Sequence, residues 1–241
     1  MYSTAFIKRV FILVILIPVV FSMGCQNRPA GQEEWQDLFD GKTLSGWKIE
    51  GGKADFYVED NMIVCNTKLD IDGGYLVTEK SYDNFILELD VKIDTSLNSG
   101  VQCRSQKWER DTITTYLAGN PEGTVSQYKW EAGYVWGYQI EVDPSDRAWS
   151  GGLYEPGNRG WVVTLADNEA ARKSFKPMDW NHLKIVMDGN KIETWVNGIL
   201  AVDVIDEMST SGFIGLQFHK AYREWQVDKK VLWKNIRIKE L

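Results

Sequence analysis

The sequence predicts an all-β fold in which two antiparallel sheets pack face to face. Short segments of alternating apolar and polar residues, rich in β-branched and aromatic side chains, recur along the chain. Turn sequences separate them, among them Glu-Asp-Asn at 59–61, Asp-Gly-Asn at 188–190 and Asn-Gly at 197–198. Helix is scarce, and residues 167–173 could form a turn or two. Short strands at such regular spacing are typical of a two-sheet sandwich.

The predicted strands are spread along the chain from residue 56 to residue 238. They are residues 56–58, 62–65, 75–77, 85–93, 100–104, 138–142, 160–164, 182–187, 191–196, 213–218 and 231–238. About 210 residues follow residue 34, which is enough for one domain with a sizeable core. No internal repeat or low-complexity linker divides them. We therefore expect a single domain over residues 35–241.

Alternation along residues 137–143 separates two kinds of side chain. Successive side chains leave opposite faces of a strand, so the apolar residues at 138, 140 and 142 share one face. Gln139, Glu141 and Asp143 then share the other face. Two carboxylates and an amide on one ridge are groups suited to proton transfer or cation binding.

Two further strands repeat this arrangement. Gln102 and Arg104 alternate with apolar residues in segment 101–104, and Gln217 and His219 do so in segment 214–219. The polar face of an antiparallel sheet is often merely solvated, in which case Lys, Glu and Thr usually dominate it. Here it collects Gln, Arg, Glu, Asp and His, which favours a functional site.

The N-terminus has the features of an export signal. A basic segment ending at Lys8-Arg9 precedes an almost unbroken apolar run over residues 10–21. A run of about a dozen residues is too short to span a bilayer as a permanent helix and is typical of a cleavable signal. We therefore predict a signal peptide over residues 1–24.

The end of this signal, Ser-Met-Gly-Cys at residues 22–25, resembles a bacterial lipobox, although Ser22 stands where leucine is commoner. The resemblance implies lipid attachment at Cys25, which would tether a soluble domain to a membrane. An ordinary signal or an uncleaved anchor is the alternative. Residues 25–34 then form a short polar tether without a dense acidic run. We expect a lipid-anchored protein of the bacterial envelope, on the periplasmic side of the outer membrane.

Charge and cysteine content limit the partners. The chain carries 27 Lys and Arg against 34 Asp and Glu, a net charge of −7, and cleavage after residue 24 removes Lys8 and Arg9 and no acid. An acidic domain binds phosphates poorly, so nucleic acid is not expected as a partner. Cys65 and Cys103 could form a disulfide after export. Both lie in apolar runs, which favours two buried thiols.

Several motifs resemble those of one known family. They include Leu-Phe-Asp-Gly-Lys-Thr-Leu-Ser-Gly-Trp at 38–47, Asn-Ser-Gly-Val at 98–101 and Gly-Tyr-Gln-Ile-Glu-Val-Asp at 137–143. Gly-Gly-Leu-Tyr at 151–154, Trp-Asn at 180–181, Trp-Val-Asn-Gly at 195–198, Gly-Leu-Gln-Phe-His at 215–219 and the ending at 235–241 complete the set. The chain is similar to 3-keto-disaccharide hydrolase domain proteins, long known only as a domain of unknown function. The resemblance covers residues 35–241.

This resemblance implies both a fold and a substrate. The fold is a concanavalin A-like jelly roll whose concave sheet carries the ligand. The substrate is a glucoside or disaccharide oxidised to a ketone at carbon 3, and a dehydrogenase that makes this ketone is the implied functional partner. The ketone acidifies the hydrogen on carbon 2, so a base can start an elimination that expels the oxygen on carbon 1. Addition of water then completes a net hydrolysis.

The polar face supplies candidates for each role in this elimination. Glu141 or Asp143 would be the base, Arg104 would stabilise the oxyanion, and His219 would deliver the proton to the leaving oxygen. The amides would hold sugar hydroxyls: Gln102, Gln139 and Gln217.

A divalent cation could take the oxyanion role instead. Glu141, Asp143 and His219 are the candidate ligands, although their spacing matches no metal-binding motif. No cofactor is otherwise implied. The chain has two histidines, which excludes a three-histidine zinc site, and His182 at a strand start is expected to be structural.

Two loops are expected to border the site. Segment 144–161 is rich in glycine and in charged and aromatic residues, as expected of a loop that shapes a pocket. Its candidate substrate-binding residues are Arg147, Tyr154, Arg159 and Trp161. The two arginines could equally pair with neighbouring carboxylates and only stiffen the loop. Segment 107–134 is an insertion beside the cleft whose aromatic residues could contact sugar.

Two other functions remain open at this point. A conventional retaining glycosidase needs carboxylates roughly 5–5.5 Å apart. Glu141 and Asp143 are separated by two residues of one strand, roughly 6–7 Å, which weakens that alternative. The other is a carbohydrate-binding lipoprotein that recognises sugar without cleaving it. The eleven tryptophans suit both alternatives, because indole rings can stack on sugars.

Overall fold

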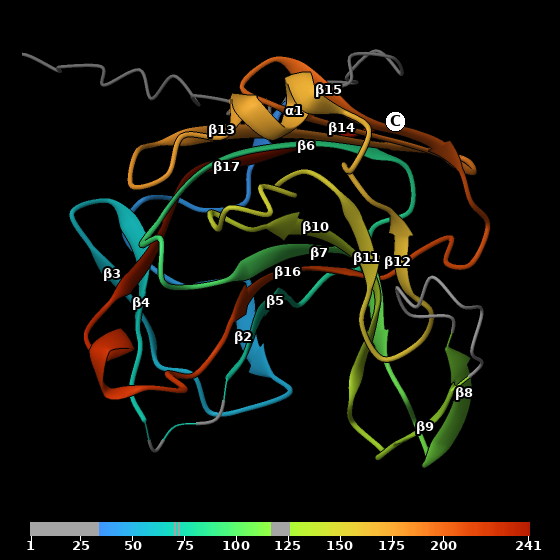
Figure 1. Cartoon of the computed structure of the whole chain (residues 1–241), viewed down its shortest axis with the longest axis horizontal. Helices are drawn as coiled ribbons and strands as arrows, with labels where there is room; N and C mark the ends of the chain where they lie inside the picture. Colours follow the sequence, from blue (N-terminus) through green and yellow to red (C-terminus); the bar gives the residue numbers. More distant parts are fainter. Residues whose placement is uncertain (1–33, 70, 72, 117–125) are drawn as a thin grey trace, which may run out of the picture. The chain divides into compact units, whose positions relative to one another are not determined.

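The computed structural model describes residues 34–69, 71, 73–116 and 126–241. Within them, two large antiparallel sheets pack against each other, which confirms the predicted sandwich (Figure 1). The predicted signal over residues 1–24, Cys25 and nearly all of the tether lie outside the described residues. No helix in the described part of the chain is long and apolar enough to cross a membrane.

The first sheet contains eight of the described strands and forms one layer of the sandwich. Its order is β15 (Ile199–Ile205), β14 (Lys191–Val196), β13 (Asn181–Asp188), β6 (Phe85–Ile93), β17 (Lys230–Glu240), β4 (Met62–Asn66) and β3 (Phe56–Glu59), and β1 (Gln36–Asp37) pairs with β17.

The second sheet contains seven of the described strands and carries the polar face predicted from the sequence. Its order is β12 (Gly160–Val163), β11 (Leu153–Glu155), β10 (Val135–Val142), β7 (Ser99–Lys107), β16 (Phe213–Phe218), β5 (Gly74–Thr78) and β2 (Trp47–Glu50). A separate hairpin, β8 (Thr112–Tyr116) and β9 (Ser126–Trp130), extends from the β11–β12 side of this sheet (Figure 1).

The core lies between the two sheets. Leu87 and Leu89 of β6 and Tyr138 and Ile140 of β10 are all buried in one apolar cluster that joins the layers. Complete burial of an aliphatic or aromatic side chain contributes about 1.5–3 kcal/mol each. This cluster fixes which face of β10 points inward. The alternate residues of the strand must therefore point to the opposite, concave face.

The described helical structure is short, as predicted. α1 (Glu169–Ser174) starts two residues later and ends one residue later than the expected turn, and the Asn168 side chain caps it by accepting a hydrogen bond from the N–H of Ala171. A 3₁₀ turn, η1 (Glu224–Gln226), follows β16.

Several strands were not predicted. They are β1, β2, β11, β15 and the β8–β9 hairpin. β2 and β15 lie at sheet edges, where a strand has few partners and its apolar pattern is weak. In β15, for example, Ile199, Leu200 and Ile205 are all exposed, so strict alternation does not identify the strand.

A bulge in β7 changes the direction of one predicted site residue. Arg104 has a left-handed backbone conformation with φ of 47°. The pairing of β7 with both neighbours shifts register nearby, between its partners Trp136 and Tyr138 on β10 and between Phe213 and Gly215 on β16. Strict alternation therefore ends at this point. Arg104 does not continue the face on which Gln102 lies.

Candidate active site

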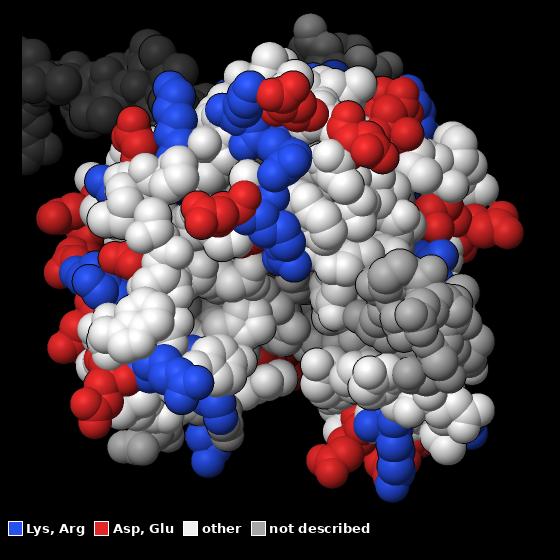
Figure 2. Space-filling view, viewed as in Figure 1, with Lys and Arg blue, Asp and Glu red and all other residues white. Residues whose placement is uncertain are grey.

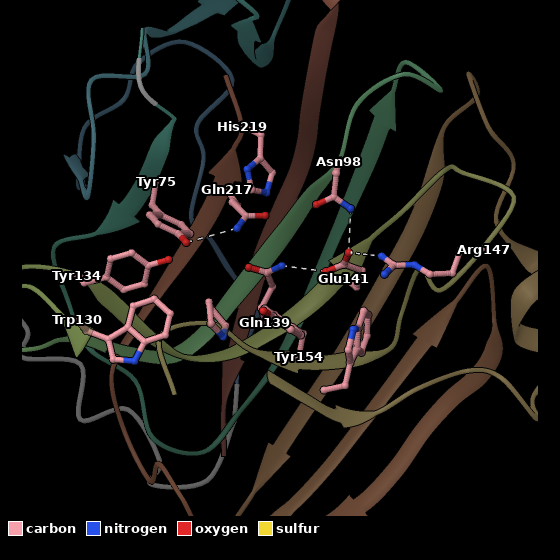
Figure 3. A pocket seen from close by; sticks show the side chains of 13 residues that line it. Tyr75, Asn98, Trp130, Tyr134, Gln139, Glu141, Arg147, Tyr154, Gln217 and His219 are labelled. Carbon is pink, nitrogen blue, oxygen red and sulfur yellow. Dashed lines mark hydrogen bonds and ion pairs between the residues drawn. The ribbon is translucent and has the colours of Figure 1, made fainter. Parts of the chain in front are cut away.

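A cavity of about 350 Å³ opens on the concave face of the second sheet. We call it the hollow. Figure 3 shows its side chains converging from β5, β10, β16 and the neighbouring loops. Its lining is Tyr75, Asn98, Trp130, Tyr134, Gln139, Glu141, Arg147, Tyr154, Pro156, Gly157, Trp161, Gln217 and His219. Charged side chains of both signs are interspersed around this side of the molecule, which is notched at its lower edge (Figure 2).

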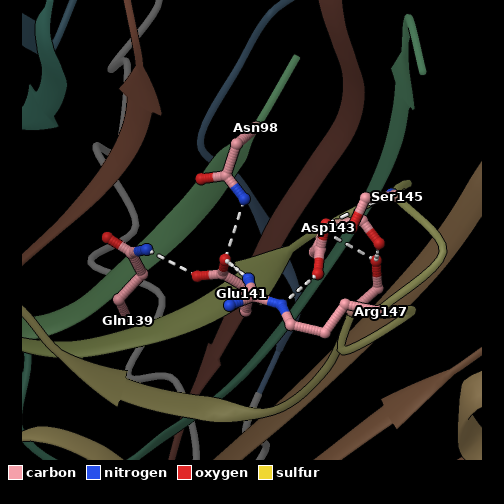
Figure 4. Close-up of polar contacts among 7 residues, drawn as sticks. Asn98, Gln139, Glu141, Asp143, Ser145 and Arg147 are labelled. Carbon is pink, nitrogen blue, oxygen red and sulfur yellow. Dashed lines mark hydrogen bonds and ion pairs between the residues drawn. The ribbon is translucent and has the colours of Figure 1, made fainter. Parts of the chain in front are cut away.

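Glu141 is the buried carboxylate of the hollow, with 4% of its surface exposed. Its Oε1 accepts hydrogen bonds from Asn98 Nδ2 at 2.8 Å and Arg147 Nη2 at 3.1 Å, and its Oε2 accepts one from Gln139 Nε2 at 2.9 Å (Figure 4). Burial raises the pKa of the Glu141 carboxyl above its usual value, although these hydrogen bonds and the Arg147 charge oppose the rise. A carboxylate of raised pKa is a stronger base than an ordinary one.

Gln139 connects Glu141 to the strand beside it. Gln102 Nε2 donates to Gln139 Oε1 at 2.6 Å, and Ser105 Oγ donates to Gln102 Oε1 at 2.9 Å. Gly100 makes room for this chain of amides, because a Cβ at that position would lie 2.5 Å from Gln139 Cγ. Gln102 therefore orients Gln139 and does not line the hollow itself.

Arg147 binds both carboxylates of the β10 ridge. Its Nε donates to Asp143 Oδ2 at 2.7 Å while Nη2 reaches Glu141 (Figure 4). The guanidinium also lies over the rings of Trp149 and Trp161, at 4.9 and 5.0 Å from their centroids. Such stacking and pairing fix the plane of the guanidinium. Arg147 thus places a positive charge in a fixed position at the rim of the hollow.

Asp143 lies beside the hollow and does not line it. Burial alone would raise the pKa of this carboxyl, but hydrogen bonds from Ser145 and Arg147 outweigh burial and hold the pKa below its usual value. Asp143 is therefore a charged partner of Arg147. Of the two carboxylates predicted as the base, only Glu141 reaches the cavity.

His219 follows β16 and points into the hollow beside Gln217, on a different side from Arg147 (Figure 3). Burial lowers the pKa of its imidazole. The ring is therefore neutral at neutral pH. Beside it, Gln217 Nε2 donates to Tyr75 Oη at 3.3 Å, while Gln217 Oε1 is buried without a hydrogen-bond partner among the described residues.

Aromatic rings form the remaining walls. Tyr154 and Trp161 meet edge to face with centroids 5.1 Å apart, and the rings of Trp130 and Tyr134 lie 4.6 Å apart on the opposite wall (Figure 3). Trp130 belongs to the β8–β9 hairpin, so the segment predicted as an insertion does border the cavity. Together with Tyr75, these four side chains give the hollow five aromatic rings. They provide apolar faces on which a sugar ring can stack.

The structure separates two predicted arginines from the hollow. Arg104 is 1% exposed and donates to the carbonyl oxygens of Asp83 and Gly189 and to Asn84 Oδ1. These residues belong to loops beside β6 and β13, so Arg104 links the two sheets. Its prediction as the oxyanion-binding group is wrong, because the bulge in β7 turns it away from the hollow.

Arg159 is likewise a structural residue. Its guanidinium pairs with Glu155 and, through Nη1 and Nη2 at 2.9 Å each, with both oxygens of Asp206. Asp206 also accepts a hydrogen bond from Tyr138 Oη. Arg159 lies outside the residues that line the hollow, so the prediction that it binds substrate is wrong and the alternative of carboxylate pairing holds.

The candidate metal ligands do not form a ligand set. In the described part of the chain, no three His, Cys, Asp or Glu side chains are grouped closely enough to hold a metal ion. Arg147 contacts both Glu141 and Asp143, so a cation already neutralises the two carboxylates. These residues do not fit a divalent cation.

The other histidine and the thiols lie elsewhere. His182 Nδ1 is 2.9 Å from Asp90 Oδ1, and neither residue lines the hollow. Cys65 and Cys103 are buried and free, as predicted. Burial raises the pKa of both thiols, which makes them unreactive.

The sequence profile of the 3-keto-alpha-glucoside-1,2-lyase-like domain matches residues 34–239. The chain belongs to this family. The lyase-like domain therefore includes every residue that lines the hollow.

The individual proteins of similar sequence or fold match this chain at low identity or over only part of its length. A protein of Bacteroides thetaiotaomicron named 3-keto-disaccharide hydrolase is 32% identical over 81 residues, which are 30% of this chain and 28% of that protein. A candidate glycosyl hydrolase of Parabacteroides distasonis has a similar fold, with a TM-score of 0.54 and 20% identity over 86% of this chain and 94% of that one. A galectin-like protein of unknown function from Bacillus subtilis gives a TM-score of 0.53 at 11% identity, over 82% and 90% of the two chains. At these identities the solved structures show that the lyase-like domain shares their lectin-like fold.

Proposed function

We propose that this protein cleaves 3-keto-glycosides by removing the proton on carbon 2 and eliminating the group on carbon 1. The observation that carries the proposal is the pair formed by Glu141 and His219, a buried carboxylate and a half-buried imidazole that line one sugar-sized cavity. Membership of the lyase-like family supports the 3-keto substrate. The amide and aromatic lining supports a carbohydrate ligand.

Glu141 starts the reaction as the base. It takes the proton from carbon 2, and the electrons of that C–H bond form an enolate whose charge rests on the oxygen at carbon 3. When the enolate returns to a ketone, a double bond forms between carbons 1 and 2 and the bond from carbon 1 to the glycosidic oxygen breaks. Water then adds across this double bond, and the net result is hydrolysis.

Arg147 is the group best placed to stabilise the enolate. Its Nε and Nη2 are used by Asp143 and Glu141, whereas Nη1 donates to no residue that the structure describes. A preorganised cation aimed at developing negative charge is among the strongest contributions to catalysis. Arg147 thus takes the role that the sequence assigned to Arg104.

His219 acts on the leaving oxygen. A neutral imidazole can donate its N–H to an oxygen that becomes negative, and need not be protonated beforehand. Its place in the hollow, on a different side from Arg147, suits contact with the glycosidic oxygen at carbon 1 (Figure 3). The proton that it gives up is replaced from water.

The substrate pair that tests this function is methyl 3-keto-α-glucoside and unoxidised methyl α-glucoside. The elimination requires the ketone, so purified protein should release methanol from the first and none from the second. Release from both would identify a conventional glycosidase. Binding without release from either would identify a carbohydrate-binding protein.

The pH dependence of kcat/KM follows from Glu141. Only the carboxylate can act as the base, and burial raises the pKa of Glu141, so activity should be lost as pH falls through that raised pKa. The loss should begin at a higher pH than the value of about 4.3 for an ordinary glutamate would give. The rate profile between pH 4 and 8 measures this. A midpoint at or below 4.3 would contradict the assignment of Glu141 as a base of raised pKa.

We also propose that lipid on Cys25 holds the protein in the bacterial envelope, where a dehydrogenase acting on the carbon-3 hydroxyl supplies the substrate. The lipobox-like sequence at 22–25 supports the anchor. The wild-type protein should then require detergent for extraction from cell membranes, and C25S should not become lipid-labelled. Labelling of C25S with radioactive fatty acid to the wild-type level would contradict the proposal.

A further inference from the structure

A second cavity of about 240 Å³, which we call the outer cavity, adjoins the hollow beside His219. Tyr75, Tyr134, Gln217 and His219 line both spaces. The other sides of the outer cavity are lined mainly by Tyr222 and by glycine backbone at positions 51, 73 and 74. Because the two cavities share four lining residues, a group bound in one lies next to a group bound in the other.

Tyr222 presents its ring to the outer cavity from a fixed turn. Gln226 Oε1 accepts hydrogen bonds from the N–H groups of Tyr222 at 2.9 Å and Arg223 at 3.1 Å, and Gln226 Nε2 donates to the carbonyl oxygen of Ser96 at 2.7 Å. This anchoring holds the turn against the sandwich. Tyr222 nevertheless remains 62% exposed. An exposed aromatic ring on an anchored turn is a preorganised stacking surface.

Gln217 provides an unused polar group where the two cavities meet. Its side chain is buried, with 5% of the residue exposed, and Oε1 has no hydrogen-bond partner among the described residues. Exchange of the amide oxygen and nitrogen would still leave one polar atom unpaired. A buried polar group without a partner costs about 1–3 kcal/mol. A sugar hydroxyl at this position would satisfy it.

We propose that the outer cavity is the subsite for the leaving group, and that Tyr222 makes the enzyme prefer a second sugar over a small alcohol. This inference rests on the proposed elimination. If His219 faces the glycosidic oxygen, the leaving group continues beyond His219, where the outer cavity lies. The second sugar then stacks on Tyr222, and one of its hydroxyls pairs with Gln217.

A third cavity also meets His219 but suits a leaving sugar less well. It shares Asn98 and His219 with the hollow, whereas the outer cavity shares four residues. Tyr222 lines this cavity as well, but the lining also includes the charged Asp143 and Lys220. The outer cavity offers three tyrosine rings and an unpaired amide, which match the faces and hydroxyls of a sugar.

The test compares two substrates that differ only in the leaving group, methyl 3-keto-α-glucoside and 3-ketotrehalose. Y222A should lower kcat/KM for 3-ketotrehalose on the order of tenfold, as expected for one lost aromatic contact. It should leave kcat/KM for the methyl glycoside within about twofold of the wild-type value. W225A is the matched control, because Trp225 is 64% exposed in the same turn and lines none of the three cavities. W225A should leave kcat/KM unchanged for both substrates. Equal loss on both substrates in Y222A, or no loss on either, would overturn the inference.

Binding separates failure of this inference from failure of the proposed function. If the wild-type protein cleaves neither substrate, the elimination is wrong. Calorimetry then measures the binding of both substrates to the E141Q protein and to the double variant that carries E141Q and Y222A. Weaker binding of 3-ketotrehalose alone in the double variant supports the subsite. Unchanged binding of 3-ketotrehalose, or equal weakening for the methyl glycoside, rejects it.

Discussion

E141Q is expected to lower kcat on methyl 3-keto-α-glucoside by about 10²–10⁴-fold, the usual contribution of a positioned general base. The amide has the size and shape of the carboxyl group but cannot accept the carbon-2 proton. Asn98 and Arg147 can still donate to its oxygen, so the fold around the hollow should persist. Steady-state kinetics measure the loss. KM should change much less than kcat, because the substrate is held mainly by other groups.

D146N is the matched control for E141Q. Asp146 lies in the loop that follows β10, is exposed and does not line the hollow. The substitution removes the same charge, so it should leave kcat within twofold. A loss in D146N equal to that in E141Q would indicate a long-range charge effect. A fully active E141Q protein would remove Glu141 from the mechanism.

R104M is expected to destabilise the protein by roughly 3–5 kcal/mol. The change removes the buried guanidinium that donates to the carbonyl oxygens of Asp83 and Gly189, and so breaks the connection between the sheets. For a domain of this size the expected fall in Tm is about 10 °C. Thermal unfolding followed by circular dichroism measures it.

R110M serves as the control for R104M, because Arg110 is exposed. It should change the free energy of unfolding by less than about 0.5 kcal/mol. The R104M protein that remains folded should keep kcat within a few-fold of the wild type. A stable but inactive R104M protein would instead support a catalytic role for Arg104.

Strand alternation predicted the centre of the site well. Gln139 and Glu141 on β10 and Gln217 on β16 lie on the concave face because their neighbours at alternate positions are fixed in the core. This information is local, since it depends only on the pleat and on which residues are apolar. The sequence therefore sufficed for the carboxylate and its amide neighbours.

Two of the misplaced residues are arginines, and both have a structural cause. The bulge at Arg104 inverts the facing of the side chain, and a bulge leaves little trace in a pattern of only four residues. Arg159 is drawn away from the hollow by Asp206, which is 47 residues distant along the chain. Alternation says nothing about such distant partners.

Six lining residues were not assigned from the sequence: Tyr75, Asn98, Trp130, Tyr134, Pro156 and Gly157. Tyr75 reaches the hollow only because β5 pairs with β16, and Trp130 because the β8–β9 hairpin folds beside the cavity. The sequence did point to Asn98, because it is the first residue of the Asn-Ser-Gly-Val motif at 98–101. In the structure Asn98 donates to Glu141 and Gly100 makes room for Gln139, which explains that motif.

The fate of deuterium on carbon 2 tests the central claim most directly. Methyl 3-keto-α-glucoside labelled with deuterium at carbon 2 is incubated with the protein in ordinary water, and methanol release and label are followed together at early times. Proton abstraction by Glu141 predicts that each molecule of methanol is accompanied by loss of the label. A released 3-keto sugar that retains its deuterium would show that the glycosidic bond breaks without removal of the carbon-2 proton, which would contradict the elimination.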